Sequence, residues 1–173
     1  MRALVLGAET PAGRALAAAL VAAGARLALV AAGADSAAAF EVQRLSRRLG
    51  ALSQAIDATN EMAVRVMTRQ VAKALGGLDA LFFCADLGAA TAEALALACR
   101  FAAREMAPDR GRGGVIVAAL PAGAVADIGT LAAEHGQKGV RLLAVDVPAA
   151  PDDAWARDLL ARLHPARGST GSP

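Results

Sequence analysis

The most constraining feature of this 173-residue chain is a regular alternation between two kinds of segment. Short runs of apolar, β-forming residues are separated by longer segments in which apolar residues recur with the period of a helix. This alternation is typical of a parallel sheet whose strands are joined by crossover helices. Runs such as LALV, ALFF and VIVA are apolar throughout, as expected for strands buried on both faces. The sequence therefore predicts an α/β fold, with a doubly wound parallel sheet of about six strands in three layers.

The same pattern assigns bounds to each element. The predicted strands cover residues 3–6, 27–30, 52–56, 80–83, 115–118 and 141–145. The predicted helices cover residues 12–23, 36–49, 61–75, 91–106 and 125–135, and an amphipathic helix over 152–163 is expected to pack at the sheet edge. Asn60 is expected to cap the third helix. One domain is expected over residues 1–164, followed by a Pro-, Gly- and Ser-rich tail, 165–173, that is expected to be disordered.

Composition argues against several classes of partner. The 18 basic and 16 acidic residues are nearly balanced, and only 3% of residues are aromatic, so a nucleic-acid partner is not expected. Two cysteines and two histidines are too few for a disulfide framework or a zinc site. The longest apolar stretch, residues 15–34, is interrupted by Arg26 and predicts no membrane span, and the N-terminus does not resemble a signal peptide. We therefore expect a cytoplasmic protein.

A glycine-containing turn, from Gly7 to Gly13, follows the first predicted strand. In dinucleotide-binding folds such a turn directs a helix N-terminus toward a pyrophosphate. Pro11 lacks an N–H group and adds bulk, and Glu9 adds a negative charge, which are both unfavourable for a phosphate. Helix initiation explains the same residues, because Thr10 is a good N-cap and Pro11 a good first helical residue. Nucleotide binding and helix initiation are both open interpretations of this turn.

Several blocks between residues 2 and 148 occur in an order that resembles the short-chain dehydrogenase family, which has a Rossmann-like fold. Gly7 and Gly13 match two glycines of its GxxxGxG loop. Residues 55–60 match the strand end whose aspartate contacts adenine, although Asp57 could equally orient the turn. Residues 83–86 stand in place of its Asn-Asn-Ala-Gly motif. The resemblance implies that the cofactor, NAD or NADP if any is bound, contacts Gly7, Gly13, Asp57, Ala58, Cys84 and Ala85.

The catalytic residues of that family have no counterpart in this chain. It contains no tyrosine, and Leu120 or Pro121 stands where the resemblance places a serine. Lys73 and Lys138 are too far from the front of the fifth helix to replace the lysine that accompanies the tyrosine. The chain therefore resembles a shortened, catalytically degenerate member, and no catalytic residue and no metal ligand is predicted.

Two further positions depart from the family pattern. The second strand ends in Ala-Ala-Gly, without an acidic residue for an NAD ribose or an arginine for an NADP phosphate, and Asp35 is a weak substitute. Cys84 could be a nucleophile, but no histidine lies in a recognisable partner position, which favours a buried structural thiol.

Three functions are compatible with these residues. The leading hypothesis is a non-catalytic subunit that associates with a protein partner as a homo- or hetero-oligomer, for example with an active dehydrogenase or within a larger assembly. The second is a nucleotide sensor that holds NAD(P) or a mononucleotide through Asp57, Ala58 and the first helix N-terminus. The third is an oxidoreductase with an unusual base, such as Asp86 or Glu134, although hydride transfer needs an ordered nicotinamide site.

Overall fold

Parallel strands form a sheet in the computed structural model of this chain, which describes residues 1–33, 35–106, 113–124, 128–136 and 139–163. The strands are β1 (Arg2–Leu6), β2 (Arg26–Ala31), β3 (Leu52–Ala55), β4 (Ala80–Phe83), β5 (Gly114–Leu120) and β6 (Val140–Asp146). Their order in space is β3-β2-β1-β4-β5-β6, and every neighbouring pair is parallel. The predicted α/β class and doubly wound, Rossmann-like sheet are confirmed.

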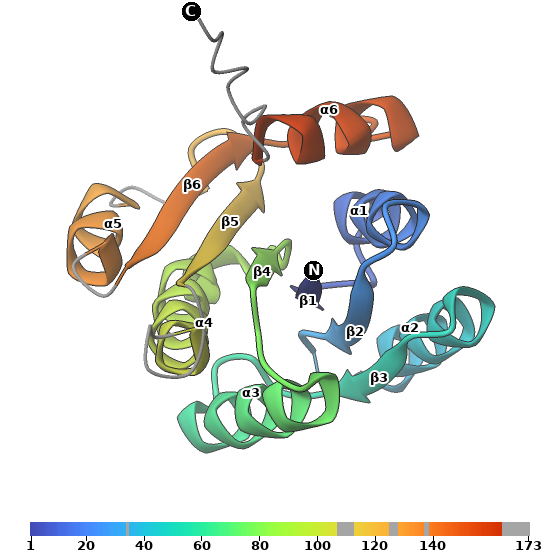
Figure 1. Cartoon of the computed structure of the whole chain (residues 1–173), viewed down its shortest axis with the longest axis horizontal. Coiled ribbons are helices and arrows are strands. Elements are labelled where there is room, and N and C mark those ends of the chain that lie inside the picture. Colours follow the sequence, from blue (N-terminus) through green and yellow to red (C-terminus); the bar gives the residue numbers. More distant parts are fainter. Residues whose placement is uncertain (34, 107–112, 125–127, 137–138, 164–173) are drawn as a thin grey trace, which may run out of the picture.

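Helices cover both faces of this sheet (Figure 1). They are α1 (Pro11–Ala22), α2 (Ser36–Leu49), α3 (Glu61–Leu75), the 3₁₀ turn η1 (Gly88–Ala90), α4 (Thr91–Met106), α5 (Ile128–Gly136) and α6 (Asp153–Leu163). One core cluster joins α1, α2 and α6 to the sheet, and a second joins α3 and α4 to its other face. No helix within the described ranges is long and apolar enough to cross a membrane.

Most predicted bounds lie within one or two residues of the observed ones. The predictions for α2, α3 and α4 match the structure, and Asn60 caps α3 by accepting a hydrogen bond from the Ala63 N–H group at 3.0 Å. Strand β5 extends three residues at its ends beyond the predicted 115–118, because the apolar run continues to Leu120. Residues 125–127 of the predicted fifth helix and the predicted tail 165–173 lie outside the described residues.

The prediction that the last helix packs at the sheet edge is wrong. Helix α6 lies against α1 on one face of the sheet, as Figure 1 shows. The buried side of α1 is rich in alanine, including Ala15 and Ala19, so that a neighbouring helix can approach closely. Apolar residues of α6, such as Leu159 and Leu163, are buried in the same core cluster.

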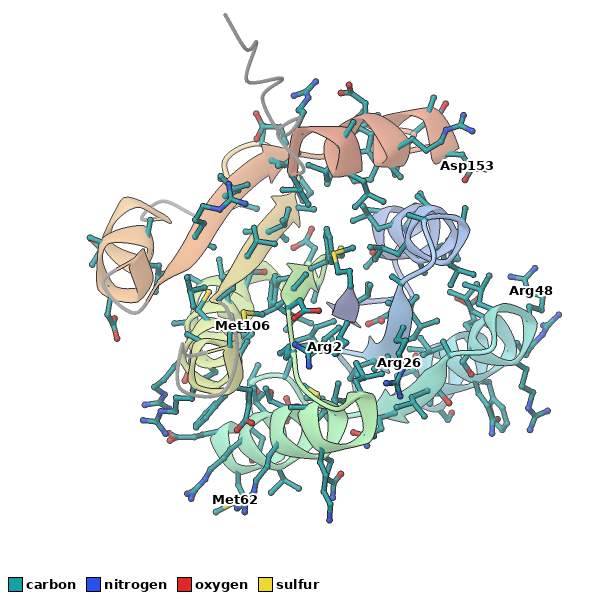
Figure 2. All side chains as sticks on the ribbon, in the orientation of Figure 1. Arg2, Arg26, Arg48, Met62, Met106 and Asp153 are labelled. Atoms are coloured by element: carbon teal, nitrogen blue, oxygen red, sulfur yellow. The ribbon has the colours of Figure 1, made fainter. Side chains whose placement is uncertain are left out.

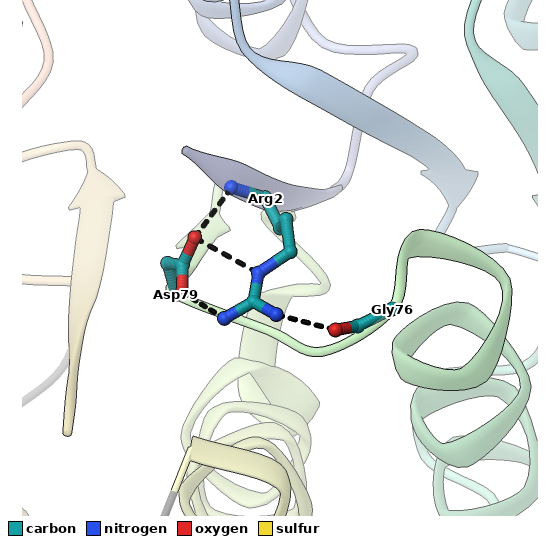
Figure 3. A network of polar contacts seen from close by, with 3 residues as sticks. All are labelled: Arg2, Gly76 and Asp79. Atoms are coloured by element: carbon teal, nitrogen blue, oxygen red, sulfur yellow. Dashed lines mark hydrogen bonds and ion pairs between the residues drawn. The ribbon is translucent and has the colours of Figure 1, made fainter. Parts of the chain in front are cut away.

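An ion pair links the amino ends of β1 and β4 (Figure 3). The Arg2 guanidinium donates to both carboxylate oxygens of Asp79 and to the Gly76 carbonyl oxygen, and the Arg2 backbone N–H group donates to Asp79 Oδ2 at 2.8 Å. The Asp79 N–H group in turn donates to the Arg2 carbonyl at 2.9 Å. These hydrogen bonds from Arg2 hold the pKa of Asp79 below its usual value, although partial burial opposes the shift.

We expect Asp79→Ala to lower the free energy of unfolding by about 1 kcal/mol at neutral pH, the upper range for a partly exposed pair. Because the folded pKa of Asp79 is lowered, this contribution is complete above the ordinary carboxyl pKa of about 4 and is lost as the pH falls through the lower folded value. Urea unfolding of wild type and variant at neutral and acidic pH measures both effects. The exposed Asp158 on α6, paired with Arg162, provides a control substitution, Asp158→Ala, with a smaller effect. A difference between wild type and Asp79→Ala that persists at a pH where Asp79 is protonated would contradict this account.

Candidate functional site

The carboxyl ends of β1, β2, β3 and β4 meet around the turn from Gly7 to Gly13. In doubly wound sheets ligands bind in the crevice at this edge. The Gly7 and Ala8 N–H groups both donate to the Val30 carbonyl, at 2.9 and 3.1 Å, which joins the turn to β2. The Cys84 N–H group donates to Leu6 at 2.8 Å, and the Ala58 N–H group donates to Ala32 at 3.0 Å. The structure therefore brings the residues predicted at this site to one edge of the sheet.

Gly7 and Gly13 are required by close backbone contacts. Gly7 has a φ of +88°, and a Cβ atom there would lie 2.4 Å from the Ala85 nitrogen. A Cβ atom on Gly13 would lie 2.3 Å from the Gly7 carbonyl oxygen. Both distances are far inside van der Waals contact with backbone atoms that cannot move away. Packing of the turn against β4 and α1 is thus sufficient to explain both glycines.

The N-terminus of α1 uses its own residues to satisfy its donors. Thr10 Oγ1 accepts from the Gly13 N–H group at 3.0 Å and donates to the Gly7 carbonyl at 2.8 Å. The Arg14 N–H group donates to the Thr10 carbonyl at 3.0 Å. Pro11 occupies the first helical position and contributes no N–H group. These contacts leave one N–H group in the first turn of α1, that of Ala12, without a partner in the described part of the chain. Most of the N–H groups that could bind a phosphate at this helix N-terminus are therefore already bonded or missing.

Glu9 places a carboxylate inside this turn, a role that the sequence did not predict. Its Oε1 atom accepts a hydrogen bond from the Ala32 N–H group, at the end of β2, at 2.9 Å. Its Oε2 atom is buried and has no hydrogen-bond partner among the described residues. The Arg14 guanidinium donates to the Glu9 backbone carbonyl and pairs with Glu41, so it does not neutralise this carboxylate. A negative charge therefore lies within the turn that precedes α1, beside the end of β2.

Asp57 and Ala58 lie at the end of β3, as predicted. Asp57 Oδ1 accepts hydrogen bonds from the N–H group of Thr59, at 2.9 Å, and from its hydroxyl, at 2.6 Å, and these bonds lower the pKa of Asp57. The carboxylate thus orients the turn into α3, which was one of the two predicted roles. Ala58 is fully buried, and its backbone N–H group is bonded to Ala32.

The end of β4 carries a buried thiol and an exposed carboxylate. Cys84 is buried, and burial, together with the negative charge of Glu9, raises the pKa of its thiol. Ala85 is buried beside Gly7. Asp86 Oδ1 accepts from the Gly88 N–H group at 3.2 Å and lies 3.5 Å from the Thr91 hydroxyl, so it helps to start η1 and α4. Each group has a structural partner or is inaccessible to solvent.

Among the described residues beyond β4, the carboxyl edge of the sheet carries no tyrosine, serine or lysine, and its carboxylate is Asp146 at the end of β6. The chain has no tyrosine, and β5 ends at Leu120, where no hydroxyl side chain follows on Pro121, Ala122 or Gly123. Lys73 lies in the last turn of α3, at the end of that helix opposite to this edge of the sheet. Lys138 lies outside the described residues. Across the ranges that the structure describes, no group of three or more His, Cys, Asp or Glu could hold a metal ion.

These contacts provide a test of whether the turn suits a dinucleotide. A pyrophosphate needs several N–H donors and no competing negative charge. Here Pro11 removes one donor, Thr10 occupies another, and the Glu9 carboxylate adds to the same turn a negative charge that no ion pair neutralises among the described residues. The residues of this turn therefore do not fit a pyrophosphate.

Known proteins resemble this chain in sequence and in fold. A family model for short chain dehydrogenase matches residues 1–98. A putative short-chain alcohol dehydrogenase from Sinorhizobium meliloti is 26% identical, with a TM-score of 0.63 over 84% of this chain and 70% of its own. A comparison with curated proteins finds no significant match.

Two other solved structures with lower identity show the same fold. A short chain dehydrogenase from Burkholderia cenocepacia, in complex with NADP, is 24% identical, with a TM-score of 0.70 over 95% of this chain and 90% of its own. An NAD⁺-bound xylitol dehydrogenase is 21% identical, with a TM-score of 0.66 over 98% of this chain and 79% of its own.

Burial of both cysteines, Cys84 at the end of β4 and Cys99 in α4, predicts that the two thiols are inert in the folded protein. Burial is the main cause that raises the pKa of Cys84, and burial with the nearby charge of Glu134 raises the pKa of Cys99 to about 12. We expect neither thiol to react with a disulfide reagent at mildly alkaline pH until the chain is unfolded in guanidinium. The variant Cys99→Ala isolates the reaction of Cys84. Rapid labelling of Cys84 in the folded variant would show that the edge between Gly7 and β4 opens, contrary to the packing described.

Proposed function

Because this chain belongs to the short-chain dehydrogenase family, whose model matches more than half of it, we propose that it is a non-catalytic member that works by association. Its role is that of a subunit, pairing with itself, with an active dehydrogenase or within a larger assembly in the cytoplasm. The region over residues 1–164 acts as one domain in this proposal.

The observation that carries the proposal is the closed turn between β1 and α1. Thr10 Oγ1 accepts a hydrogen bond from the Gly13 N–H group, and Pro11 has no N–H group. The Glu9 carboxylate accepts from the Ala32 N–H group through one oxygen, and its second oxygen is buried. An anion at this position would meet an unneutralised charge at low dielectric, where repulsion between like charges is strong. A dinucleotide that lacks its pyrophosphate contacts cannot hold a nicotinamide in place for hydride transfer.

The second support is that the catalytic tyrosine of the family has no counterpart in the sequence. General acid–base catalysis needs a side chain of suitable pKa within hydrogen-bond reach of the reacting proton. The sequence has no tyrosine. At the carboxyl edge Asp57 and Asp86 are engaged in turns that begin α3 and η1, and Asp146 ends the edge strand β6, beyond β5. The third hypothesis, an oxidoreductase with Asp86 or Glu134 as base, is therefore disfavoured, since neither accompanies an ordered nicotinamide site.

A second candidate function, a nucleotide sensor, is favoured by one feature of the same turn. The buried Glu9 Oε2 atom lacks a donor, and a ribose hydroxyl would supply one next to the end of β2. In this proposal Gly7, Gly13, Asp57, Ala58, Cys84 and Ala85 surround an adenosine rather than a complete dinucleotide. Adenosine would then bind while NAD and NADP would not, which separates this function from the leading one.

We expect calorimetric titration of the full chain with oxidised and reduced NAD and NADP to show no saturable binding tighter than about 1 mM. The variant Glu9→Ser/Pro11→Gly removes the charge and restores an N–H donor. We therefore expect NAD to bind this variant at least about tenfold more tightly than the wild type.

Two controls accompany this titration. Glu41→Ser removes a carboxylate that pairs with Arg14 outside the turn, and it should leave the wild-type result unchanged. Adenosine titrated into the wild type tests the sensor function. Micromolar NAD or NADP binding by the wild type, or cofactor turnover with carbonyl substrates, would overturn the proposal of a non-catalytic subunit.

A further inference from the structure

The edge strand β3 has unpaired backbone groups. It pairs with β2 on one side only, and no strand among the described residues lies on its other side. The Ile56 N–H group, just after β3, donates to Ala31 of β2 at 3.0 Å. Because backbone groups alternate in direction along a strand, the N–H and C=O groups of Ser53 and Ala55 point to the open edge.

Large apolar side chains gather around this open edge. Of the five large apolar side chains that are exposed in the described part of the chain, four lie on β3 or its two flanking helices. Phe40 on α2 is 65% exposed, Leu52 43%, Met62 on α3 62% and Val66 44%. Met62 points outward from α3 in Figure 2. We name Phe40, Leu52–Ala55, Met62 and Val66 the β3 surface, and a cluster of this kind marks an interaction site.

Grooves on both faces of β3 could receive side chains of a partner. Between α2 and β3 a groove is lined by Phe40, Gln43 and Gln54 among others. On the other face a wider groove between β3 and α3 is lined by Gln54, Met62 and Val66 among others. An added strand would place alternate side chains into these two grooves, because side chains of a strand alternate between faces.

Charge is distributed unequally along the β3 surface. At the Leu52 end lie Arg47, in the last turn of α2, and Lys73, in the last turn of α3. Arg48, in the same turn of α2, lines a groove with residues of α1 and α6 and is not part of this surface. At the Ala55 end lie Asp35, which caps α2, and Asp57, which follows β3. One end of the surface is therefore basic and the other acidic.

We propose that the β3 surface pairs with the β3 surface of a second copy of this chain, with the two strands antiparallel. A two-fold axis perpendicular to the sheet then brings each basic end against the acidic end of the partner, while α2 faces its own copy on one side and α3 on the other. Phe40 contacts the α2 copy, and Met62 and Val66 contact the α3 copy. The sheet continues across the two chains.

The charge pattern selects this occupant over others. A partner strand that is acidic throughout would match the basic end and be repelled at the acidic end, and a parallel pairing of two copies would set like charges together. The antiparallel pairing of two copies brings opposite charges together at both ends of the β3 surface. This inference rests on the proposed association role, but it depends on β3 and not on the closed turn. Sedimentation tests the pairing and nucleotide titration tests the turn, so either proposal can fail without the other.

Sedimentation velocity over a concentration series tests the pairing. We expect the wild type to dimerise reversibly and the variants Ser53→Pro and Ala55→Pro to weaken dimerisation at least about tenfold, because each removes an edge N–H group without breaking the β2–β3 ladder. The matched control is Ala144→Pro on the opposite edge strand. The Val147 N–H group donates to Leu120, so by alternation the Ala144 N–H group points away from β5. This variant should dimerise like the wild type, and circular dichroism confirms folding of each variant.

Charge reversal identifies the antiparallel arrangement. Arg47→Glu and Asp35→Arg should each weaken dimerisation, and the double variant should recover it. Each reversal places a charge at an end of α2 where it opposes the helix dipole, so the double variant destabilises α2 more than either single variant. Recovery of dimerisation in the double variant therefore cannot arise from a more stable helix. A monomeric wild type, a dimer that survives both proline variants, or a double variant weaker than either single one would overturn the proposal.

Discussion

The contact between Gly7 and the peptide joining Cys84 to Ala85 is the constraint on which the rest of the structure depends. A Cβ atom on Gly7 would come within 2.4 Å of the Ala85 nitrogen, and one on Gly13 within 2.3 Å of the Gly7 carbonyl. Because these are backbone atoms that directly follow the central strands β1 and β4, no rotamer change can relieve the overlap. The turn is therefore held between β2 and β4, and its position fixes the start of α1. It also fixes Glu9, whose carboxylate reaches the end of β2 for this reason.

The core and the site of this family place different demands on residues, and this chain meets only the first. Burial of strands such as β4 requires apolar volume, which Phe82 and Phe83 supply. A dinucleotide site requires particular donors and charges at particular atoms, and single changes such as Pro11 remove them. Thr10 and Pro11 support the fold, since they cap and begin α1, whereas Glu9 binds the Ala32 N–H group and leaves its Oε2 atom buried without a partner among the described residues. The same three residues remove or occupy donors near the expected phosphate position and add a negative charge to the turn, which is the basis of the proposed loss of dinucleotide binding.

Much of the fold could be predicted from local sequence, whereas the arrangement of the site could not. Apolar runs identified all six strands and helical period identified the helices, because both signals are local. The strands β1 and β2 begin one residue earlier than predicted, at Arg2 and Arg26, because the apolar criterion stopped at a charged residue although its backbone continues the strand. The bond between Glu9 and Ala32 joins residues that are distant in the chain, so no local pattern reveals it. The only sequence signal was a lone carboxylate in a turn of small residues. The open edge of β3 likewise depends on strand order, which periodicity does not determine.

The closed turn is tested most directly by following the backbone amide resonances of the ¹⁵N-labelled chain during titration with NAD⁺. If Glu9, Thr10 and Pro11 exclude the pyrophosphate, the resonances of Gly7, Ala12 and Gly13 should keep their positions throughout the titration. The Ala12 amide is the most informative of these, since it is the donor of the first turn that the contacts of the chain leave available. Saturable shifts of Ala12 and Gly13 that grow with NAD⁺ concentration would contradict the account, because they would place the cofactor on the turn that we propose to be closed.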